Sequence, residues 1–412
     1  MGNTDVKRDG GGDQTLSLIR QGYPWASRLR AGAVAVPTRL LGRRAVVVGG
    51  PEGVRRFYDL RLRRRGAIPL PVRGVLFGPG AVHGLDDAAH AHRKSLFVDV
   101  LTPAAAQDLT AAAEQGWQAT VGRWPAAGPV VLFDEAVQVI GAAVLGWAGI
   151  ALPAAECHRR SRQLAAVVDG FGTPGTPYAR ALAARWQLDR WARRLVRDTR
   201  DGRVAAGPGT ALRAVADFRD PAGRPLPARV AAVELLNLVR PTVAAAWFVA
   251  FAGLALHERP QWRDRIAAGD EAALAAFAHE VRRLYPFVPV LAAKARSDQD
   301  VAGVRVRRGS LVVLDLHGTD HDPAHWEDPE AFDPGRFLGP APDPDTLVPQ
   351  GGGTVATGHR CPGEAVVLGQ ITAAVLVLSR SPYRLPPQDL GVDLTRMPTR
   401  PRSGVLLTAD RQ

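Results

Sequence analysis

A lone cysteine on a glycine-rich loop is the feature of this sequence most suggestive of chemistry. Cys361 lies in the stretch GGGTVATGHRCPGEAVVLG, from Gly351 to Gly369, directly before an apolar run that fits a helix. Glycines allow close approach of the backbone, and the positive end of a following helix favours a thiolate, so the loop could ligate iron. A buried structural cysteine is the alternative for a single thiol. A zinc site is less favoured, because no second cysteine or paired histidine spacing lies near it.

An acid and two arginines form a second candidate group. Glu280 and Arg283 lie three residues apart in EVRR, which places them on one face of a predicted helix, and DPGRF supplies Arg336 about fifty residues later. Taken singly, Glu280 and Arg283 would be an ordinary surface pair on a helix. Glu280, Arg283 and Arg336 point to a function only together with the cysteine loop that follows them in the chain.

The composition favours a globular protein with a large core. The chain has 412 residues, of which 46% are hydrophobic and 22% charged, and no linker or repeat divides it, so we expect one domain over residues 1–412, with residues 1–15 disordered. No signal peptide is recognisable, which favours the cytoplasm. The two cysteines lie in unlike contexts and exclude a disulfide framework.

A formal charge of +12 raises the possibility of a nucleic-acid partner. The arginines are scattered, and the densest run, RLRRRG at residues 61–66, lacks interleaved aromatic residues. We therefore expect no nucleic acid. Two long apolar runs, 139–155 and 242–257, are interpreted as buried helices, because one contains Pro153 and the other is short of the roughly 20 residues that a membrane span needs.

Helices must carry most of these residues. Apolar residues recur at helical spacing over 86–101, 133–150 and 182–196. Residues 228–258 predict one long central helix interrupted only by Pro241, and Asp270 can cap a helix that Pro286 ends. VRVRRGSLVVLDLHG predicts a hairpin that turns at Arg308 and Gly309. The fold class is therefore mainly α with small β-sheets.

In this order and spacing, the three motifs resemble the Glu-x-x-Arg motif, the Pro-x-Arg-Phe segment and the haem-thiolate loop of cytochrome P450 proteins. The resemblance covers nearly the whole chain and implies a fold with haem b between the central helix and the cysteine loop. It implies Cys361 as the axial iron ligand and a structural network of Glu280, Arg283 and Arg336. One position departs from the family: the usual phenylalanine seven residues before the cysteine is here Thr354.

The central helix narrows the resemblance to the fatty-acid peroxygenase branch. It reads NLVRPTVAAAW, with Arg240 and Pro241 where oxygen-activating members carry an acid and an alcohol. A buried arginine needs an anion, since its charge cannot be lost by deprotonation. This anion could be a haem propionate or the carboxylate of Glu234. The resemblance implies another, the carboxylate of a long-chain fatty acid, which would also replace the missing acid–base residue. Hydrogen peroxide would then be the cosubstrate, and no reductase would be required.

Further site residues follow from the same resemblance. A carboxylate fixed at Arg240 leaves the α and β carbons within reach, which implies 2- or 3-hydroxy acids, or a terminal alkene after decarboxylation. His83 lies where the family carries glutamine or histidine, and it is interpreted as a proton donor that favours decarboxylation. His90, Lys94 and His359 are assigned to the haem propionates, with solvated surface residues as the alternative. Phe77 and Phe287 are assigned to the acyl-chain channel, although core packing would also explain them.

Two other functions stay open from the sequence. A reductase-dependent monooxygenase would need a proton relay that the central helix does not display. A non-catalytic haem or fatty-acid binding protein would show the same binding residues without turnover. Peroxide-dependent product formation distinguishes both from the peroxygenase.

Overall fold

Helices form most of the molecule, as the sequence predicts. The computed structural model describes residues 12–58, 61–285, 287–356 and 358–409. The helices are α1 (Thr15–Gln21), α2 (Trp25–Arg30), α3 (Gly50–Phe57), α4 (Leu70–Val72), α5 (Asp87–Val100), α6 (Pro103–Val121), α7 (Trp124–Ala127), α8 (Leu132–Trp147), α9 (Ala154–Gly170), α10 (Thr176–Arg200), α11 (Ala211–Asp217), α12 (Ala228–Val243), α13 (Ala245–Glu258), α14 (Pro260–Ala267), α15 (Glu271–Leu284), α16 (Leu316–Asp320) and α17 (Glu364–Ser379). Three short helical turns, η1 (Arg73–Phe77), η2 (Val82–Gly84) and η3 (Pro334–Phe337), complete the helical part.

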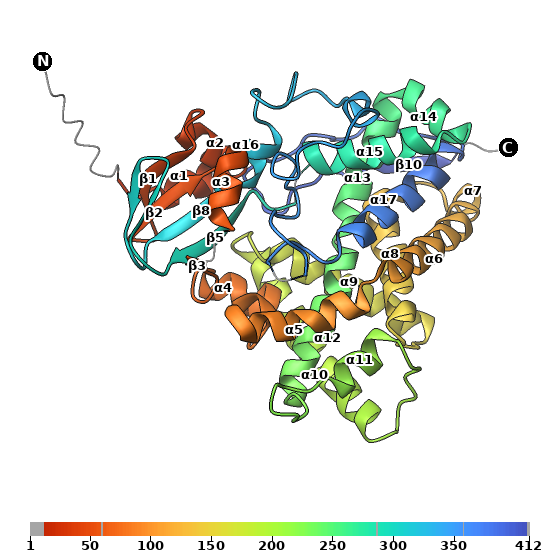
Figure 1. Cartoon of the computed structure of the whole chain (residues 1–412). Helices are drawn as coiled ribbons and strands as arrows, with labels where there is room; N and C mark the ends of the chain where they lie inside the picture. Colours follow the sequence, from red (N-terminus) through yellow and green to blue (C-terminus); the bar gives the residue numbers. More distant parts are fainter. Residues whose placement is uncertain (1–11, 59–60, 286, 357, 410–412) are drawn as a thin grey trace, which may run out of the picture.

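The strands are short and gather mainly at one end of the molecule (Figure 1). They are β1 (Ala35–Leu40), β2 (Arg43–Val48), β3 (Leu62–Arg63), β4 (Val130–Val131), β5 (Val290–Ala295), β6 (Gln299–Val301), β7 (Val304–Val306), β8 (Leu311–Asp315), β9 (Tyr383–Arg384) and β10 (Leu406–Ala409). The largest sheet has the order β1-β2-β8-β5-β3, in which β8 pairs parallel to β2 and antiparallel to β5. The predicted class, mainly α with small sheets, is confirmed.

The predicted hairpin at Arg308 and Gly309 is wrong. Strand β7 pairs antiparallel with β6, and β8 pairs with β2 and β5 instead. The turn falls at Ala302 and Gly303, both with positive φ, of 50° and 78°. Positive φ at both central residues gives the twist that a two-residue hairpin needs. An alanine in that position gave no signal of this turn.

The central helix, which the sequence predicts as one long element interrupted only by Pro241, is divided shortly after that proline. α12 ends at Val243 and α13 begins at Ala245, so the segment after Pro241 starts a second helix. Proline removes a backbone donor and clashes with the preceding turn, which explains a break at this point. The two helices run through the middle of the helical part of the molecule (Figure 1).

The apolar character of this segment reflects burial. Within the described residues, 228–258 is the one helical stretch that is long and apolar enough to span a membrane. Of its most apolar window, 94% is buried inside the fold. The second run interpreted as a buried helix, residues 242–257, therefore lies in the core. The first run, 139–155, is a buried helix only in part: α8 ends at Trp147, and Ala151, Ala154 and Ala155 are exposed.

The beginning of the chain was expected to be disordered over residues 1–15. Residues 1–11 lie outside the described part of the chain. Of the remainder, Asp13 forms a parallel bridge with Arg39, and α1 begins at Thr15.

Candidate functional site

One cavity of about 290 Å³ lies between the α12–α13 junction, the segment from Leu76 to His83, helix α5 and the cysteine loop. Its walls are mainly apolar, and no aspartate or glutamate lies among the described residues that line it. Nine residues that the sequence analysis assigned to the site all line this cavity: Phe77, His83, His90, Lys94, Arg240, Pro241, Phe287, His359 and Cys361. The fold thus brings together residues that are up to 284 positions apart, Phe77 and Cys361, at one place.

The glycines before Cys361 allow a tyrosine to pack on the loop. A Cβ atom added at Gly351, Gly352 or Gly353 would lie within 3 Å of atoms of Tyr58 or Val54. Gly351 and Gly353 also have φ values of +88° and +73°, which favour glycine. The glycines therefore let the loop backbone pack closely against Tyr58, and Gly351 also lines the cavity.

Thr354 explains how the loop is built without the usual phenylalanine. Its hydroxyl oxygen accepts a hydrogen bond from the Gly358 backbone N–H at 3.0 Å. A Cβ atom at Gly358 would lie 2.7 Å from the Thr354 carbonyl oxygen. The turn before the cysteine is closed by a polar contact in place of an aromatic ring.

The environment of Cys361 differs in one respect from the sequence-based expectation. Desolvation raises the pKa of the thiol, while a hydrogen bond from the Gly363 backbone N–H lowers it. The sequence predicts that the following helix lowers the pKa of the thiol. In the protein without haem, desolvation outweighs this effect, because an uncompensated thiolate is costly in an apolar cavity. The Gln350 Nε2 atom lies 3.9 Å from Sγ. α17 begins at Glu364, three residues after Cys361, so the predicted helix after the loop is present.

The predicted network of an acid and two arginines is present next to the cysteine loop. Arg283 forms a bidentate ion pair with Glu280, with Nε–Oε2 and Nη2–Oε1 distances of 2.7 and 2.8 Å, and both side chains are fully buried. Arg336 Nε lies 3.3 Å from Glu280 Oε1. Arg283 also donates to the carbonyl oxygens of Asp320 and Pro329. The network fastens α15 to the loops that follow the main sheet.

Basic side chains gather along one rim of the cavity. Lys94 is 4% exposed, and its Nζ atom donates to the carbonyl oxygens of Gly358 and Arg360 at 2.6 and 2.7 Å. The rings of His90 and His359 stack with centroids 3.9 Å apart. Burial lowers the pKa of Lys94 to about 8 and that of His90 to about 4, so this histidine is neutral at pH 7. The rim therefore offers one ammonium and two imidazoles for an anion.

Arg240 is a buried cation that points into the cavity without a carboxylate partner in the described part of the chain. It is 5% exposed, its Nη2 atom donates to Asn237 Oδ1 at 3.1 Å, and its Nε atom has no partner. Burial lowers the pKa of Arg240 to about 9, and the nearby cation Arg185 adds to that effect. A buried guanidinium in this state is stabilised by any anion that reaches it.

Glu234, which the sequence left open as a partner of Arg240, is engaged elsewhere. Its Oε1 atom accepts from Arg93 at 2.8 Å and from the Val82 backbone N–H at 2.9 Å. Asn237 lies between the two groups: its Nδ2 atom donates to Glu234 Oε2 at 3.3 Å and to the Phe77 carbonyl oxygen at 3.0 Å. The segment from Phe77 to Val82 is thereby fastened to α12 (Ala228–Val243).

His83 lies against Phe77, with ring centroids 4.2 Å apart. Burial lowers its pKa to about 3, with further contributions from Arg240, His90 and Lys94. The expectation that this imidazole titrates near neutral pH is therefore wrong for the protein alone: His83 is neutral, and it can act only as a neutral hydrogen-bond donor or acceptor. Burial is the main cause of the difference, because it disfavours the charged imidazolium, and the nearby positive charges of Arg240 and Lys94 add to it.

Phe77 and Phe287 occupy two sides of the cavity. The Arg240 Cζ atom lies 5.9 Å from the centroid of the Phe77 ring. Phe287 packs against Trp247 and Phe171 with centroid distances of 6.1 and 6.2 Å, so it belongs to the core as well as to the cavity wall.

Several lining residues were missed by the sequence analysis. They are mostly apolar or amide side chains and include Phe97, Leu101, Asn237, Phe248, Val288, Gln350 and Arg360. Asn237 carried a usable signal, because it precedes Arg240 by three residues and therefore lies on the same helix face. The others have no chemical signature apart from their neighbours in the fold.

The donor set fits a haem. A thiol, a largely apolar cavity and a rim of one ammonium and two imidazoles match a flat macrocycle whose iron takes one sulfur ligand and whose propionates are anionic. The buried His83 Nδ1 and Arg240 Nε atoms, which have no partner in the described structure, lie on the α12 and η2 side. That side is thus available to polar ligands.

Comparisons with known proteins agree with this geometry. The family model described as "Cytochrome P450" matches residues 271–374, which contain the acid–arginine network and the cysteine loop. Among curated proteins, cytochrome P450 132 of Mycobacterium tuberculosis is 36% identical over 103 residues, covering 24% of this chain and 22% of that protein. Cytochrome P450 4A7 of Oryctolagus cuniculus is 30% identical over 31% of this chain and 25% of its own length. The chain thus spans about a quarter or less of the length of the curated relatives that it matches.

Solved structures match over nearly the whole chain. Cytochrome P450SP alpha in complex with (R)-ibuprofen is 38% identical, with a TM-score of 0.93, and the match covers 97% of this chain and 98% of that one. Ligand-free cytochrome P450 OleT is 33% identical, with a TM-score of 0.93 and coverage of 99% and 100%. A variant of OleT in complex with arachidonic acid is 32% identical, with a TM-score of 0.92 and coverage of 98% and 99%.

Proposed function

This chain belongs to the cytochrome P450 family, in its fatty-acid peroxygenase branch, and we propose that it uses hydrogen peroxide to hydroxylate long-chain fatty acids at the α and β carbons and to decarboxylate part of them to terminal alkenes. The observation that carries this proposal is the buried Arg240 guanidinium, which faces the same cavity as Cys361 and has no carboxylate partner among the described residues. Arachidonic acid bound to a variant of the similar protein OleT supports the choice of ligand.

Cys361 would hold the iron of haem b, and His90, Lys94 and His359 would receive its propionates. When bound there, haem supplies the redox chemistry, since a thiolate ligand favours cleavage of the O–O bond. Lys94 has two backbone carbonyl partners from the cysteine loop, so it would connect a propionate to the loop that carries the ligand.

Arg240 would bind the fatty-acid carboxylate through its planar guanidinium. Two parallel N–H···O bonds orient a carboxylate and favour its ionised form. Asn237 is neutral, so it orients the guanidinium from one side and leaves its charge for the substrate. Pro241, at the next position, precedes the end of α12 and contributes to the cavity wall.

The bound carboxylate would carry the proton of hydrogen peroxide. Within the described residues, no aspartate or glutamate lines the cavity, so its walls supply no carboxylate to accept that proton. The substrate oxygen held at Arg240 is the remaining candidate. Catalysis would therefore depend on the presence of the substrate carboxylate.

The fixed anchor would also set the position of attack. The first carbons after a carboxylate held at Arg240 lie near the anchor, whereas the rest of the chain extends along apolar side chains such as Phe77, Phe287 and Val288. Restricting the reactive carbon in this way is an orientation effect. Oxidation at the α and β positions follows.

No reductase is needed in this scheme, and we place the protein in the cytoplasm as a single haem-thiolate domain over residues 1–412. A reductase-dependent monooxygenase is less favoured, because the described part of α12 presents Arg240 and Pro241 to the cavity where a proton-delivering acid would be required.

The test replaces Arg240 by leucine and, as a matched control, by lysine. The haem-loaded proteins are incubated with palmitic acid and hydrogen peroxide, and hydroxy acids and alkenes are quantified by mass spectrometry. Loss of two charge-assisted hydrogen bonds should lower kcat/KM on the order of 100-fold, or about 2.7 kcal/mol, in Arg240→Leu, with a smaller loss in Arg240→Lys. The absorbance spectrum of the carbon monoxide complex verifies haem binding in each variant. Unchanged oxidation by Arg240→Leu would disprove the proposed role.

A further inference from the structure

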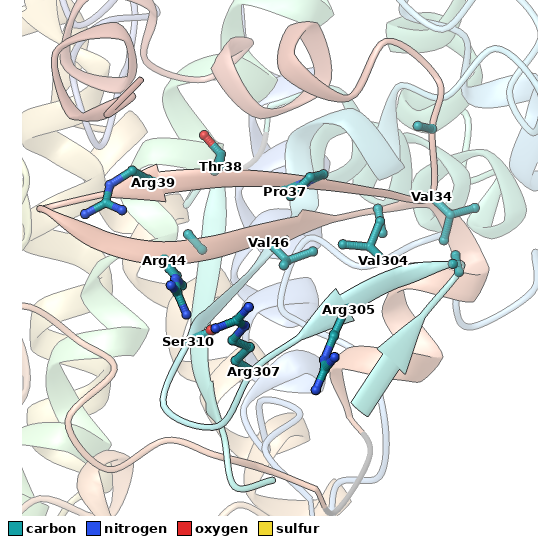
Figure 2. Close-up of a pocket in the computed structure, with 15 residues that line it drawn as sticks. Val34, Pro37, Thr38, Arg39, Arg44, Val46, Val304, Arg305, Arg307 and Ser310 are labelled. Carbon is teal, nitrogen blue, oxygen red and sulfur yellow. The ribbon is translucent and has the colours of Figure 1, made fainter. Parts of the chain in front are cut away.

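A second concave site lies on the sheet end of the molecule. A groove of about 900 Å³ runs between the β1–β2 ribbon and the β6–β7 hairpin (Figure 2). It shares no lining residue with the cavity that holds Cys361. The proposed peroxygenase reaction therefore gives it no role.

Four arginines line this groove from two sides. Arg39 on β1 and Arg44 on β2 are directly opposite in the antiparallel ladder, and Arg305 and Arg307 approach from the other hairpin (Figure 2). Like charges at directly opposite positions of two strands destabilise a sheet. The repulsion between Arg39 and Arg44, increased by the other two arginines, would be relieved by an anion in the groove.

The protein itself supplies little compensating charge. No aspartate or glutamate appears among the described residues that line the groove. Arg305 Nη2 lies 3.3 Å from Asp298 Oδ2, but both side chains are more than half exposed, so this pair contributes little. Arg39 donates to the Gly42 carbonyl oxygen. Within the described chain, the guanidinium groups of Arg44 and Arg307 have neither a hydrogen-bond partner nor an ion-pair partner.

Two other acids close to this end, Asp300 and Asp13, accept hydrogen bonds from the protein itself. Asp300 lies opposite Arg305 in the β6–β7 ladder and accepts a hydrogen bond from the Gly303 backbone N–H at 2.9 Å. Asp13 accepts hydrogen bonds from the backbone N–H groups of Thr15 and Gly42 and from the Thr15 hydroxyl. These hydrogen bonds and the charge of Arg39 lower the pKa of Asp13. Its carboxylate therefore offsets part of the charge of Arg39. Within the described chain, no ion pair reaches Arg44 or Arg307, so positive charge remains in the groove.

We propose that this groove binds a small soluble anion that carries several phosphate groups. The planar guanidinium matches the oxygens of a phosphate, and four such groups around one concavity suit several phosphates better than one. A volume of about 900 Å³ is in the range of small-molecule pockets, and a recessed groove is a poor match for a flat bilayer surface. No aromatic side chain lies among the described lining residues, so recognition is directed at the phosphates and not at a base.

The test is isothermal titration calorimetry, in which the haem-loaded full chain is titrated with tripolyphosphate at 0.05 M and 0.3 M salt. One saturable site is expected, with weaker binding at the higher salt concentration because added ions screen the interaction. Inorganic phosphate should bind at least about tenfold more weakly than tripolyphosphate, since it contacts fewer arginines.

The variant Arg44→Gln/Arg307→Gln removes two groove arginines that have no partner in the described structure. It should weaken tripolyphosphate binding at least about tenfold. The matched control, Arg193→Gln/Arg194→Gln, removes the same charge from an exposed part of α10 (Thr176–Arg200) and should leave the affinity within about twofold. Thermal unfolding verifies that both variants are folded. Arg305→Gln is the single substitution to use if the groove double variant is not folded.

Three results would overturn the proposal: no saturable binding of tripolyphosphate, an equal loss of binding in the groove and control variants, or binding only to vesicles of phosphatidylglycerol and not to the soluble anion. Because the readout is binding and not product formation, failure here is distinguishable from failure of the proposed peroxygenase function.

Discussion

Asn237 holds the Arg240 guanidinium through a hydrogen bond from Nη2 to Oδ1 at 3.1 Å, and it does so as a neutral group. The same side chain donates to the carbonyl oxygen of Phe77 at 3.0 Å. One amide therefore orients the cation and connects it to the opposite wall of the cavity. A carboxylate in this position would orient Arg240 equally well but would also cancel its charge.

We expect Asn237→Asp to impair fatty-acid binding more than Asn237→Ala. The alanine variant loses one hydrogen bond to a charged group, which should raise the Kd of palmitic acid about tenfold. The aspartate variant places a competing anion beside Arg240 and should raise it further. The measurement is titration of each haem-loaded variant with palmitic acid, followed by the shift of the haem absorbance. If Asn237→Asp bound the acid as well as the wild type, a charge-preserving role for Asn237 would be excluded.

We expect Glu234→Gln to destabilise the fold. The glutamate is fully buried and accepts hydrogen bonds from Arg93 and from the Val82 backbone N–H, so the substitution leaves a largely buried guanidinium without its counter-ion. The free energy of unfolding should fall by about 2–3 kcal/mol, measured by urea denaturation. In the double variant Arg93→Met/Glu234→Gln, part of that loss should be recovered, because no unpaired charge remains. Additive losses would contradict the pairing.

We expect His83→Gln to lower the alkene share of the products. His83 is the polar side chain of the η2 segment that lines the cavity, and glutamine keeps a donor but changes its position. A roughly twofold decrease in the ratio of alkene to hydroxy acid corresponds to about 0.4 kcal/mol in relative barrier height. Products are quantified by mass spectrometry at equal conversion. An unchanged ratio would remove His83 from the branching step.

The pH dependence of that ratio provides a separate test. Since the pKa of His83 is lowered to about 3, its imidazole stays neutral from pH 6 to pH 8. The ratio should therefore be flat over this interval in the wild type. A titration step near pH 6.5 that is absent in His83→Gln would show that the imidazole is protonated during the reaction.

Buried histidines should make the fold less stable below pH 6.5, and His317 is one of them. His317 is 8% exposed, and burial, with a contribution from His321, lowers its pKa to about 3. Below its ordinary pKa of about 6.5 the unfolded chain binds a proton that the folded chain does not, so protonation favours unfolding. Between pH 7.5 and 5.5 the cost from this histidine should be about 1.4 kcal/mol. His317→Phe should reduce the slope of the urea-derived stability profile over this interval by that amount, because other buried histidines such as His83 and His90 still contribute. An unchanged slope would contradict the assignment.

The residues with chemical or ion-pair roles could be predicted from sequence because they occur in short motifs with fixed spacing. Cys361 lies on a glycine loop, Glu280 and Arg283 lie on one helix turn, and Arg240 is followed by Pro241. The apolar wall could not be predicted in the same way. Phe97 and Val288 have the composition of ordinary core residues, and only the packing of α5 and the segment after α15 brings them to the cavity.

The pairing of strands was the least predictable part of the fold. β8 pairs with β2, more than 250 residues earlier, and this long-range pairing leaves no local pattern around Arg308. The electrostatic state of His83 was also hidden from sequence. It depends first on burial in the cavity and then on Arg240, His90 and Lys94, which lie on other elements and meet His83 only in the folded protein.

A cavity wall without a carboxylate of its own has a consequence for the time between turnovers. In the proposed reaction the fatty-acid carboxylate accepts the proton of hydrogen peroxide. When hydrogen peroxide enters the cavity before the fatty acid, no carboxylate is present among the side chains described around the cavity. Idle consumption of the oxidant should then be slow. Aromatic residues near the site of peroxide activation can be oxidised by the protein's own reaction. Slow consumption of peroxide without substrate would reduce this damage.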